Sequence, residues 1–277
     1  MKKPPIMNNT PPHADPAAVR RTSLDLLYHG QASHLGTSMS MVEIMVAIFA
    51  SIDCTKIRDR GADRSRVIVS KGHGACCTYS TMHHYGLIPE DDLRTYHQDG
   101  SRLAGHVSHA VGPIEHSTGA LGHGLSVAVG CALGLRTRGY HDARVFVVLG
   151  DGEIQEGSIW EALMLARHCG LTNLVPIIDN NRISSITRTD QVINMHPLAE
   201  RFAGFGFKVH DIDGHDVHAL IEAFADLRDA DRPGVVIANT VKGKGVAFAE
   251  DQPIWHYRTL NETTYREALA GLATETA

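Results

Sequence analysis

The sequence lacks several features that would place it in a specialised class of protein. No apolar run approaches the roughly 18 residues of a membrane-spanning helix. The net charge is −5, so no excess of positive charge indicates nucleic acid or an anionic membrane as a partner. Residues 1–16 contain five prolines and no apolar segment of a secretory signal. We expect them to form a flexible arm before a single domain at 17–277.

Cysteine is also scarce, and its pattern indicates neither a disulfide framework nor a metal-binding pair. The five cysteines are odd in number and include no Cys-x-x-Cys spacing. This favours free thiols in a reducing compartment and predicts a cytoplasmic protein, with Cys76 and Cys77 packed inside a helix. What the chain does have is an ordinary core-forming composition, with 43% hydrophobic and 21% charged residues. Its 277 residues suffice for one large α/β domain or two small ones.

The most informative stretch alternates apolar runs with glycine-rich or polar breaks. Apolar runs at 145–149 and 174–178 indicate strands, and they flank a helical pattern at 157–168. The first run leads to Asp151, which stands between two glycines, and the second leads to Asn181. Parallel strands end at one edge of a sheet, and about 30 residues make one strand–helix–strand unit. The two side chains are therefore predicted to lie close together.

This pair offers one carboxylate and one amide oxygen, which suit a hard divalent cation such as Mg²⁺ or Ca²⁺. Mg²⁺ keeps coordination positions open for water and phosphate oxygens. The glycine-rich turn after the first strand precedes a helix N-terminus, which favours phosphate as well. The combination predicts a diphosphate bridged by a metal ion. The alternative is an ordinary strand–helix–strand unit in which Gly-Asp-Gly is only a tight turn.

Gly-Asp-Gly at 150–152 and Asn-Asn at 180–181 together resemble the motif of thiamine-diphosphate enzymes. Two nearby segments, Glu-Ile-Gln-Glu-Gly at 153–157 and Ile-Trp-Glu-Ala at 159–162, are more particular. They resemble the transketolases, and especially the N-terminal subunit of transketolases that are split into two chains. The resemblance spans roughly residues 19–257. It implies thiamine diphosphate with Mg²⁺, Ca²⁺ or Mn²⁺, and transfer of a two-carbon ketol unit from a ketose phosphate to an aldose phosphate.

Strand candidates alternate with helices along the whole chain. Besides the two above, apolar runs at 66–69, 207–212 and 233–240 are predicted strands. The pattern predicts one α/β domain, with a doubly wound, mainly parallel sheet and helices on both faces. The resemblance implies the same architecture, as the diphosphate-binding (PP-type) domain of the thiamine-diphosphate-binding fold.

Local signals predict where the first helices begin. Asp15 followed by Pro16 predicts a helix start, and Ser40 is expected to cap a helix over 41–50. The segment 32–38, small residues around His34, is predicted to be a loop. A histidine in such a loop is more often a solvated or capping residue than a catalyst, but the resemblance implies that His34 contacts substrate hydroxyls.

Two further glycine-rich turns follow in the chain. His73 stands between glycines just after the strand at 66–69. Its imidazole can donate a hydrogen bond, and the glycines let backbone approach a ligand closely. The resemblance implies that His73 holds the cofactor phosphates and that the turn containing Gly119 and Leu121 passes under the aminopyrimidine ring. It also implies that the carbonyl of Ile183 is a third protein ligand of the metal.

The resemblance gives a complete set of predicted site residues. The catalytic candidates are His34, His106 and His256; the cofactor-binding candidates are His73, Gly119, Leu121, Gly152, Glu156, Asn181 and His256; the metal ligands are Asp151, Asn181 and Ile183. Imidazoles suit the proton transfers because they titrate near working pH. His109, His116 and His123 receive no role. Departures from the family pattern at Leu35, Val107 and 184–187 leave the identity of the sugar substrates open.

One part of the family's active site is missing from this sequence. In the family, a glutamate on a second, pyrimidine-binding domain drives deprotonation of the cofactor, and that domain would begin about where this chain ends. The resemblance therefore implies a partner, a C-terminal transketolase subunit in an α2β2 assembly, with Glu156 near the junction. One alternative is a subunit of a deoxyxylulose-phosphate synthase or 2-oxoacid dehydrogenase. The set of histidines and the pair Trp255-His256 argue against this alternative. The other is a non-catalytic cofactor-binding subunit.

Overall fold

Five parallel strands form the centre of the computed structural model, which describes residues 13–275. In the sheet they stand in the order β1-β2-β3-β5-β4, and every neighbouring pair is parallel. The strands are β1 (Arg66–Val69), β2 (Val145–Gly150), β3 (Leu174–Asn180), β4 (Lys208–Asp213) and β5 (Gly234–Asn239). All five predicted strands are present, and the predicted parallel α/β fold is confirmed.

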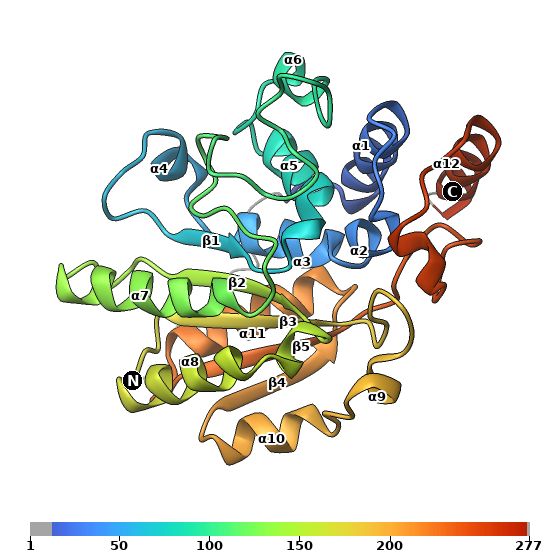
Figure 1. The fold of residues 1–277 in the computed structure, drawn as a ribbon. Coiled ribbons are helices and arrows are strands. Elements are labelled where there is room, and N and C mark those ends of the chain that lie inside the picture. The colour runs from blue at the N-terminus through green and yellow to red at the C-terminus, as the bar shows by residue number, and fades with distance from the viewer. Residues whose placement is uncertain (1–12, 276–277) are drawn as a thin grey trace, which may run out of the picture.

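Helices connect the strands and cover both faces of the sheet (Figure 1). The α-helices are α1 (Pro16–His29), α2 (Leu35–Ser40), α3 (Val42–Ala50), α4 (Cys54–Arg58), α5 (Ala75–His84), α6 (Glu90–Leu93), α7 (His123–Thr137), α8 (Gly157–His168), α9 (Thr189–Val192), α10 (Leu198–Gly204), α11 (Val217–Arg228) and α12 (Glu262–Glu275). Three short 3-10 helices, η1 (Gly72–Gly74), η2 (Glu153–Gln155) and η3 (Pro253–His256), lie in connecting segments.

The alternation of side chains along each strand divides the core in two. In β2, Phe146 and Val148 pack into a cluster with α1, α3, α5 and α11. Val147 and Leu149 point to the other face and pack with α7, α8 and α10. Because both faces of the strand are buried, β2 is an uninterrupted apolar run. The carboxyl ends of the strands are thus the part of the sheet left free to carry polar groups.

The helix start at Asp15 is confirmed, because its side chain accepts a hydrogen bond from the N–H of Ala17 at 3.0 Å. The predicted loop at 32–38 is confirmed only for residues 32–34, and the predicted cap at Ser40 is wrong. Residues 35–40 form α2, whose six residues are all buried. Ser40 is the last residue of that helix, and its hydroxyl donates to the Asp179 carboxylate at 2.6 Å instead of capping α3. Of the predicted flexible arm, residues 1–12 lie outside the described part of the chain.

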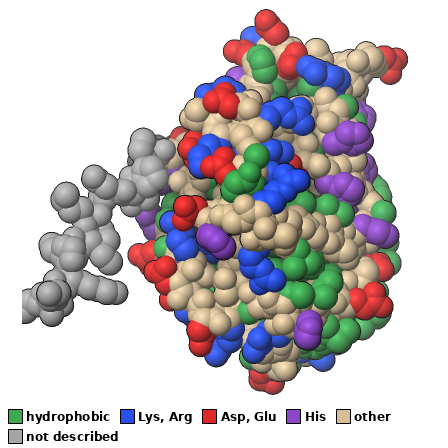
Figure 2. Space-filling view, turned by 90° about the vertical axis from the view of Figure 1, so that its left-hand side faces the viewer, with side chains coloured by type: hydrophobic (Ala, Val, Ile, Leu, Met, Phe, Trp, Pro, Cys, Tyr) green, Lys and Arg blue, Asp and Glu red, His purple; other side chains and the backbone are tan. Residues whose placement is uncertain are grey.

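The surface and the cysteines agree with the composition. Figure 2 shows acidic and basic side chains interspersed over one face of the molecule. All five cysteines are unpaired, and Cys76 and Cys77 are buried in α5 as predicted. Burial raises the pKa of the Cys77 thiol to about 12, so it is an unreactive packing residue. Within residues 13–275, no helix is long and apolar enough to cross a membrane.

Candidate functional site

A cavity of about 530 Å³ lies at the carboxyl ends of β1, β2 and β3, where open α/β sheets bind ligands. It brings together nearly all of the residues singled out in the sequence. The predicted residues in its wall are His34, His73, His106, Gly119, Leu121, Asp151, Gly152, Asn181, Ile183 and His256. Glu156 is the exception. It is an exposed residue at the N-cap of α8, beside Gly122, and its predicted cofactor role stays a prediction.

One buried carboxylate joins the glycine-rich turns that build this cavity. Glu153, only 1% exposed, accepts hydrogen bonds from the Ser70 hydroxyl, from Gly122 N–H at 2.8 Å and from Gly150 N–H at 3.1 Å. These partners follow β1, precede α7 and end β2, respectively. Gly124 lies so close to Ser70 that a Cβ on it would meet the serine hydroxyl at 2.4 Å. Glu153 was not singled out from the sequence, although it directly follows the Gly-Asp-Gly motif.

Four predicted histidines form one cluster of rings. The centroid of the His34 ring lies 5.6 Å from that of His73, 5.3 Å from that of His106 and 5.1 Å from that of His256. The rings of His73 and His256 are 5.2 Å apart. Because these residues come from four separate segments of the chain, the fold itself assembles the cluster. The backbone N–H of His34 also donates to the backbone carbonyl of His256 at 3.1 Å, and this bond joins the start of α2 to η3.

The cavity lowers the pKa values of these imidazoles and keeps them uncharged, so the expectation that they titrate near working pH is wrong. Burial, then the neighbouring His106 and Lys242, lower the pKa of His34 to about 4. Burial, Lys242 and His34 lower that of His256 to about 3. Burial and Lys71 hold the pKa of His73 well below its usual value, and burial also lowers that of His106. Near neutral pH each ring therefore has one N–H donor and one nitrogen acceptor.

The predicted metal ligands lie on the same side of the cavity. Asp151 and Asn181 are 5% and 6% exposed, and both line its wall with Ile183. The Asp151 carboxylate accepts a hydrogen bond from Gly152 N–H at 2.9 Å, and the backbone N–H of Asp151 donates to the backbone carbonyl of Asp179, near the end of the next strand, at 3.3 Å. Burial, together with the nearby Asp179 carboxylate, raises the pKa of Asp151 to about 7. A buried carboxylate in this position fits a bound cation, which would hold it ionised.

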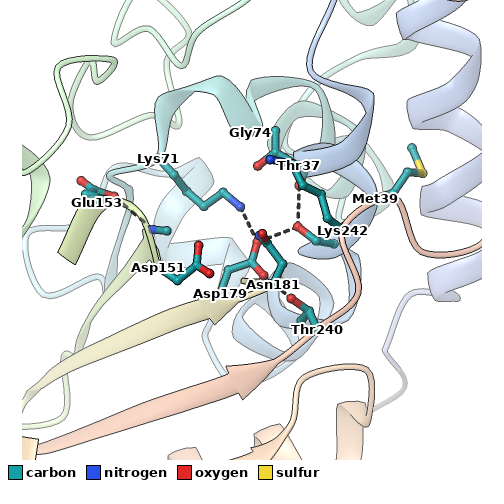
Figure 3. Close-up of polar contacts among 12 residues, drawn as sticks. Thr37, Met39, Lys71, Gly74, Asp151, Glu153, Asp179, Asn181, Thr240 and Lys242 are labelled. Carbon is teal, nitrogen blue, oxygen red and sulfur yellow. Dashed lines mark hydrogen bonds and ion pairs between the residues drawn. The ribbon is translucent and has the colours of Figure 1, made fainter. Parts of the chain in front are cut away.

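A buried ion pair beneath this site was not foreseen. Lys71, 1% exposed, reaches from the end of β1 to the fully buried carboxylate of Asp179 (Figure 3). Burial favours the neutral acid, but Lys71 and the hydroxyls of Ser40 and Thr240 outweigh it and keep the pKa of Asp179 low. The signal available in the sequence was a lysine directly before the Gly-His-Gly turn.

Lys242 is the second buried lysine that was not predicted from the sequence. Its ammonium donates to the carbonyl oxygens of Ile183 at 2.9 Å and Ser184 at 2.7 Å. Burial, and then the charge of Lys71, lower its pKa to about 8. It belongs to a Lys-Gly-Lys-Gly run at 242–245, a pattern that can indicate either a basic phosphate loop or a simple connector to Trp255-His256. Its lysine lies in the cavity wall.

The donor set fits a polyanion bound together with a divalent cation. Lys242 has no carboxylate partner among residues 13–275, and the Thr37 hydroxyl in the same wall is buried without a hydrogen-bond partner. The same cavity wall holds three predicted ligand oxygens, from Asp151, Asn181 and the Ile183 carbonyl, and the last of these already accepts a hydrogen bond from Lys242. Within residues 13–275, no three or more His, Cys, Asp or Glu side chains, the four clustered histidines included, are arranged so that they could hold a metal ion among themselves. A single carboxylate with two neutral oxygens leaves coordination positions open for phosphate.

Comparison with known proteins gives this arrangement a family context. Residues 14–272 match the family model described as the thiamine diphosphate binding domain of transketolase. The chain is 38% identical over 244 residues to an apulose-4-phosphate transketolase subunit of Actinobacillus succinogenes, covering 87% of this chain and 88% of that protein. It is 32% identical to the 6-deoxy-6-sulfo-D-fructose transketolase subunit SqwG of a Clostridium species, over 94% and 95% of the two chains. It also superposes on the transketolase of Leishmania mexicana with a TM-score of 0.83 at 27% identity, covering 93% of this chain and 40% of the other.

Proposed function

This chain belongs to the transketolase family, and on that premise we propose that it is the subunit that holds thiamine diphosphate and a divalent metal while a ketol unit moves between sugar phosphates. The observation that carries the proposal is the single cavity whose wall holds four uncharged imidazoles together with Lys242, Asp151 and Asn181. When bound, the cofactor supplies a carbanion at its thiazolium ring. Everything else must come from the protein.

The residues of the cavity divide into two groups by what they can do. Asp151, Asn181 and the Ile183 carbonyl would hold the metal, and His73, Lys242 and Thr37 would donate to the phosphate oxygens. Gly119, Leu121 and Gly152 would lie against the cofactor, as the family resemblance implies. His34, His106 and His256 are left as the groups that exchange protons with, or hydrogen-bond to, the hydroxyls of the sugar. Because their pKa values are low, these imidazoles are uncharged near neutral pH, and each can donate a hydrogen bond from one ring nitrogen and accept one at the other.

A partner chain is the second part of the proposal. Two relatives that match this chain over most of their length are named as subunits of a transketolase, and single-chain transketolases such as that of Pongo abelii are matched over only 39% of their length. We propose that residues 17–277 form one diphosphate-binding domain and that a C-terminal subunit brings the pyrimidine-binding domain, in an α2β2 assembly. The oxygen ligands favour Mg²⁺ as the metal, and the free thiols support a cytoplasmic location.

The expected substrates are phosphorylated or otherwise anionic sugars. Apulose 4-phosphate and 6-deoxy-6-sulfo-D-fructose appear in the names of two relatives, so both belong in the first panel of donors, beside ordinary ketose phosphates. Pyruvate belongs there too, because it would reveal a deoxyxylulose-phosphate synthase or a 2-oxoacid dehydrogenase. Mg²⁺-dependent ketol transfer by the reconstituted pair supports the proposal. Turnover of pyruvate in place of ketoses contradicts it.

Replacing His106 by alanine tests whether the chain is catalytic or only binds the cofactor. We expect kcat for ketol transfer to fall about 100-fold, because a positioned acid–base group is lost, while the Kd for thiamine diphosphate with Mg²⁺ stays within about twofold of the wild-type value. His109→Ala is the matched control, since His109 is an exposed histidine of the same loop whose ring pairs with Ser117. Unchanged turnover in His106→Ala would argue for a non-catalytic role of the chain.

The rim of the cavity predicts where the partner docks. Large apolar side chains stand exposed around its mouth, with Ile186 72% exposed and Tyr257 62% exposed, next to Leu121 and Val192. Ile186→Glu is expected to weaken co-purification with the partner at least about tenfold, because a charge in a desolvated interface costs more than about 1.4 kcal/mol. Ala225→Glu adds the same charge to the exposed side of α11 and should leave assembly intact. Equal retention of both variants would refute this docking face.

A further inference from the structure

A chain of polar side chains leads from α1 to the segment that carries Lys242. It starts at Arg20, whose guanidinium donates to both carboxylate oxygens of Glu43, at 2.8 and 3.0 Å. Glu43, in the first turn of α3, lies against the ring of His215, with 2.9 Å between Oε2 and Nδ1. The other ring nitrogen, Nε2, accepts a hydrogen bond from the backbone N–H of Val241 at 2.9 Å. The proposed reaction gives no role to these residues.

The geometry sets the protonation of this chain. A backbone N–H can only donate, so Nε2 of His215 has no hydrogen and Nδ1 carries the hydrogen that is donated to Glu43. Burial acts to raise the pKa of Glu43, but the hydrogen bond from His215 and the charge of Arg20 outweigh it and hold that pKa below its usual value. The side chains of His215 and Glu43 are only 15% and 8% exposed, so little water competes for their bond. The ring therefore has one orientation that satisfies both of its nitrogens.

The backbone around His215 is also held in place. The N–H of Gly214 donates to the carbonyl of Asn239, at the end of β5, and that of His215 donates to the side chain of Asp213, both at 2.8 Å. A Cβ on Gly214 would stand 2.5 Å from the methyl carbon of Thr240, so a larger residue would push the turn away from β5. The ring thus has a fixed place beside the segment that follows β5.

Hydrogen bonds to the surrounding structure hold the backbone of that segment, residues 241–243. Its first N–H donates to His215. The carbonyl of Lys242 accepts from the N–H of Asp251, and the last N–H of the segment donates to the carbonyl of Gly36, both at 2.9 Å. Gly36 also leaves room for the stem of the lysine, because a Cβ there would stand 3.0 Å from Cγ of Lys242. Among these bonds, the one to His215 is made to a side chain, so a substitution can remove it.

We propose that His215 is a positioning residue for Lys242, and that through Val241 it holds the lysine where the ammonium reaches the phosphate oxygens of the cofactor. This rests on the proposed function, which gives Lys242 that role. The ammonium is buried against the carbonyls of Ile183 and Ser184, and hydration would favour its turning toward water. The backbone must oppose that movement. When the bond from Val241 is lost, the segment adopts other conformations, and the apparent Kd rises as the competent fraction falls.

Asparagine and glutamine at position 215 separate the two bonds of the ring. The side-chain oxygen of glutamine can take the place of Nε2 and accept from Val241, whereas asparagine reaches only as far as Nδ1. We expect His215→Asn to raise the Kd for thiamine diphosphate with Mg²⁺ about tenfold and His215→Gln to raise it less than about threefold. The matched control is His218→Asn, at an exposed histidine of α11, which should change nothing. Calorimetry on the full chain measures all four proteins.

A double-mutant cycle tests whether the effect passes through Lys242. Lys242→Met alone is expected to raise the same Kd at least about tenfold, because a charged donor is lost. Adding His215→Asn to Lys242→Met should then raise the Kd by less than about twofold, since there is no ammonium left to position. An equal loss of affinity in both backgrounds would show a general structural role and would overturn the proposal. If Lys242→Met does not fold by its melting curve, Lys242→Gln replaces it in the cycle.

Hydrogen exchange of the ligand-free chain separates this inference from the proposed function. The amide of Val241 is expected to exchange at least about tenfold faster in His215→Asn than in the wild type or in His215→Gln, because its hydrogen bond opens more often. Unchanged exchange in His215→Asn would overturn the positioning role, whether or not the cofactor binds. This exchange pattern in a wild-type chain that does not bind thiamine diphosphate would support the anchoring of Lys242 by His215 and count against the proposed function alone.

Discussion

Replacing Asp151 by asparagine is expected to weaken binding of Mg²⁺ with thiamine diphosphate by at least about 100-fold. The same change should make the metal-free chain more stable at pH 8. The first effect follows because Asp151 is the only carboxylate among the three predicted ligands. The second follows because burial and the nearby Asp179 raise the pKa of Asp151 to about 7, so that at pH 8 the folded chain carries a buried charge with no metal beside it.

The pH dependence has a definite sign. Between the ordinary pKa of 3.8 and the folded value of about 7, the folded state of the wild type binds a proton that the unfolded state has lost. Its stability without metal therefore falls as pH rises through this window. The difference between wild type and Asp151→Asn should be near zero at pH 4 and grow to about 4 kcal/mol at pH 8. Mg²⁺ affinity of the wild type should rise over the same range, because the ligand must be ionised.

Calorimetric melting in EDTA at pH 4, 6 and 8 measures the stability difference, and titration with Mg²⁺ measures the affinity. Asp91→Asn, in the exposed first turn of α6, is the matched control and should change neither quantity. An Asp151→Asn chain that is less stable than the wild type at pH 8 without metal would show that Lys71 already compensates the charge. Unchanged Mg²⁺ affinity would remove Asp151 from the metal site.

Replacing Lys71 by methionine is expected to cause the largest loss of stability. The change leaves the carboxylate of Asp179, which is fully buried, without its cation. Removing one member of a buried ion pair typically costs about 3–5 kcal/mol, which is about 10 °C in melting temperature for a domain of this size. Two hydroxyls, from Ser40 and Thr240, still donate to Asp179 and keep the loss from being larger. Thermal and urea unfolding of the purified chain measure it.

The matched control is Lys56→Met. Lys56 also pairs with an aspartate, Asp63, but both side chains of that pair are 45% exposed, so it should cost less than about 1 kcal/mol. In the double variant Lys71→Met with Asp179→Asn, the uncompensated charge disappears and at least half of the lost stability should return. If the double variant is as unstable as Lys71→Met alone, the cost lies in packing around the lysine stem and not in the charge.

The strands and the pair of metal ligands could be predicted because their signals are local. β2 and β3 are apolar runs that end at Gly-Asp-Gly and at Asn181, and strand direction alone brings those ends to one edge of the sheet. The helix α8 was predicted with its observed bounds because its apolar spacing is regular and its flanks are polar. The histidines of the cavity were found through short glycine-flanked motifs that can be compared with a family one at a time.

The features that were missed depend on partners far apart in the sequence. Lys71 and Asp179 are separated by 108 positions, and Ser40 and Asp179 by 139. The sequence around each residue therefore gives no local signal of these contacts. The same contact explains the error at α2. Its sequence, Leu-Gly-Thr-Ser-Met-Ser, has the weak helix propensity of a loop, but packing buries all six residues and tertiary burial overrides propensity.

The carboxylate of Glu153 connects the three glycine-rich turns of the cavity through hydrogen bonds. Gly122 and Gly150 donate their N–H groups to it directly, and Gly124 donates to Ser70, whose hydroxyl is itself bound to Glu153. A backbone amide exchanges its hydrogen with water only when its bond opens. Because these bonds meet at one side chain, the amides of Gly122, Gly124 and Gly150 should exchange as one cooperative unit, which Ser70 joins to the turn after β1. The rigidity of the cavity would then depend on one carboxylate whose two oxygens are both bound to other residues of the chain.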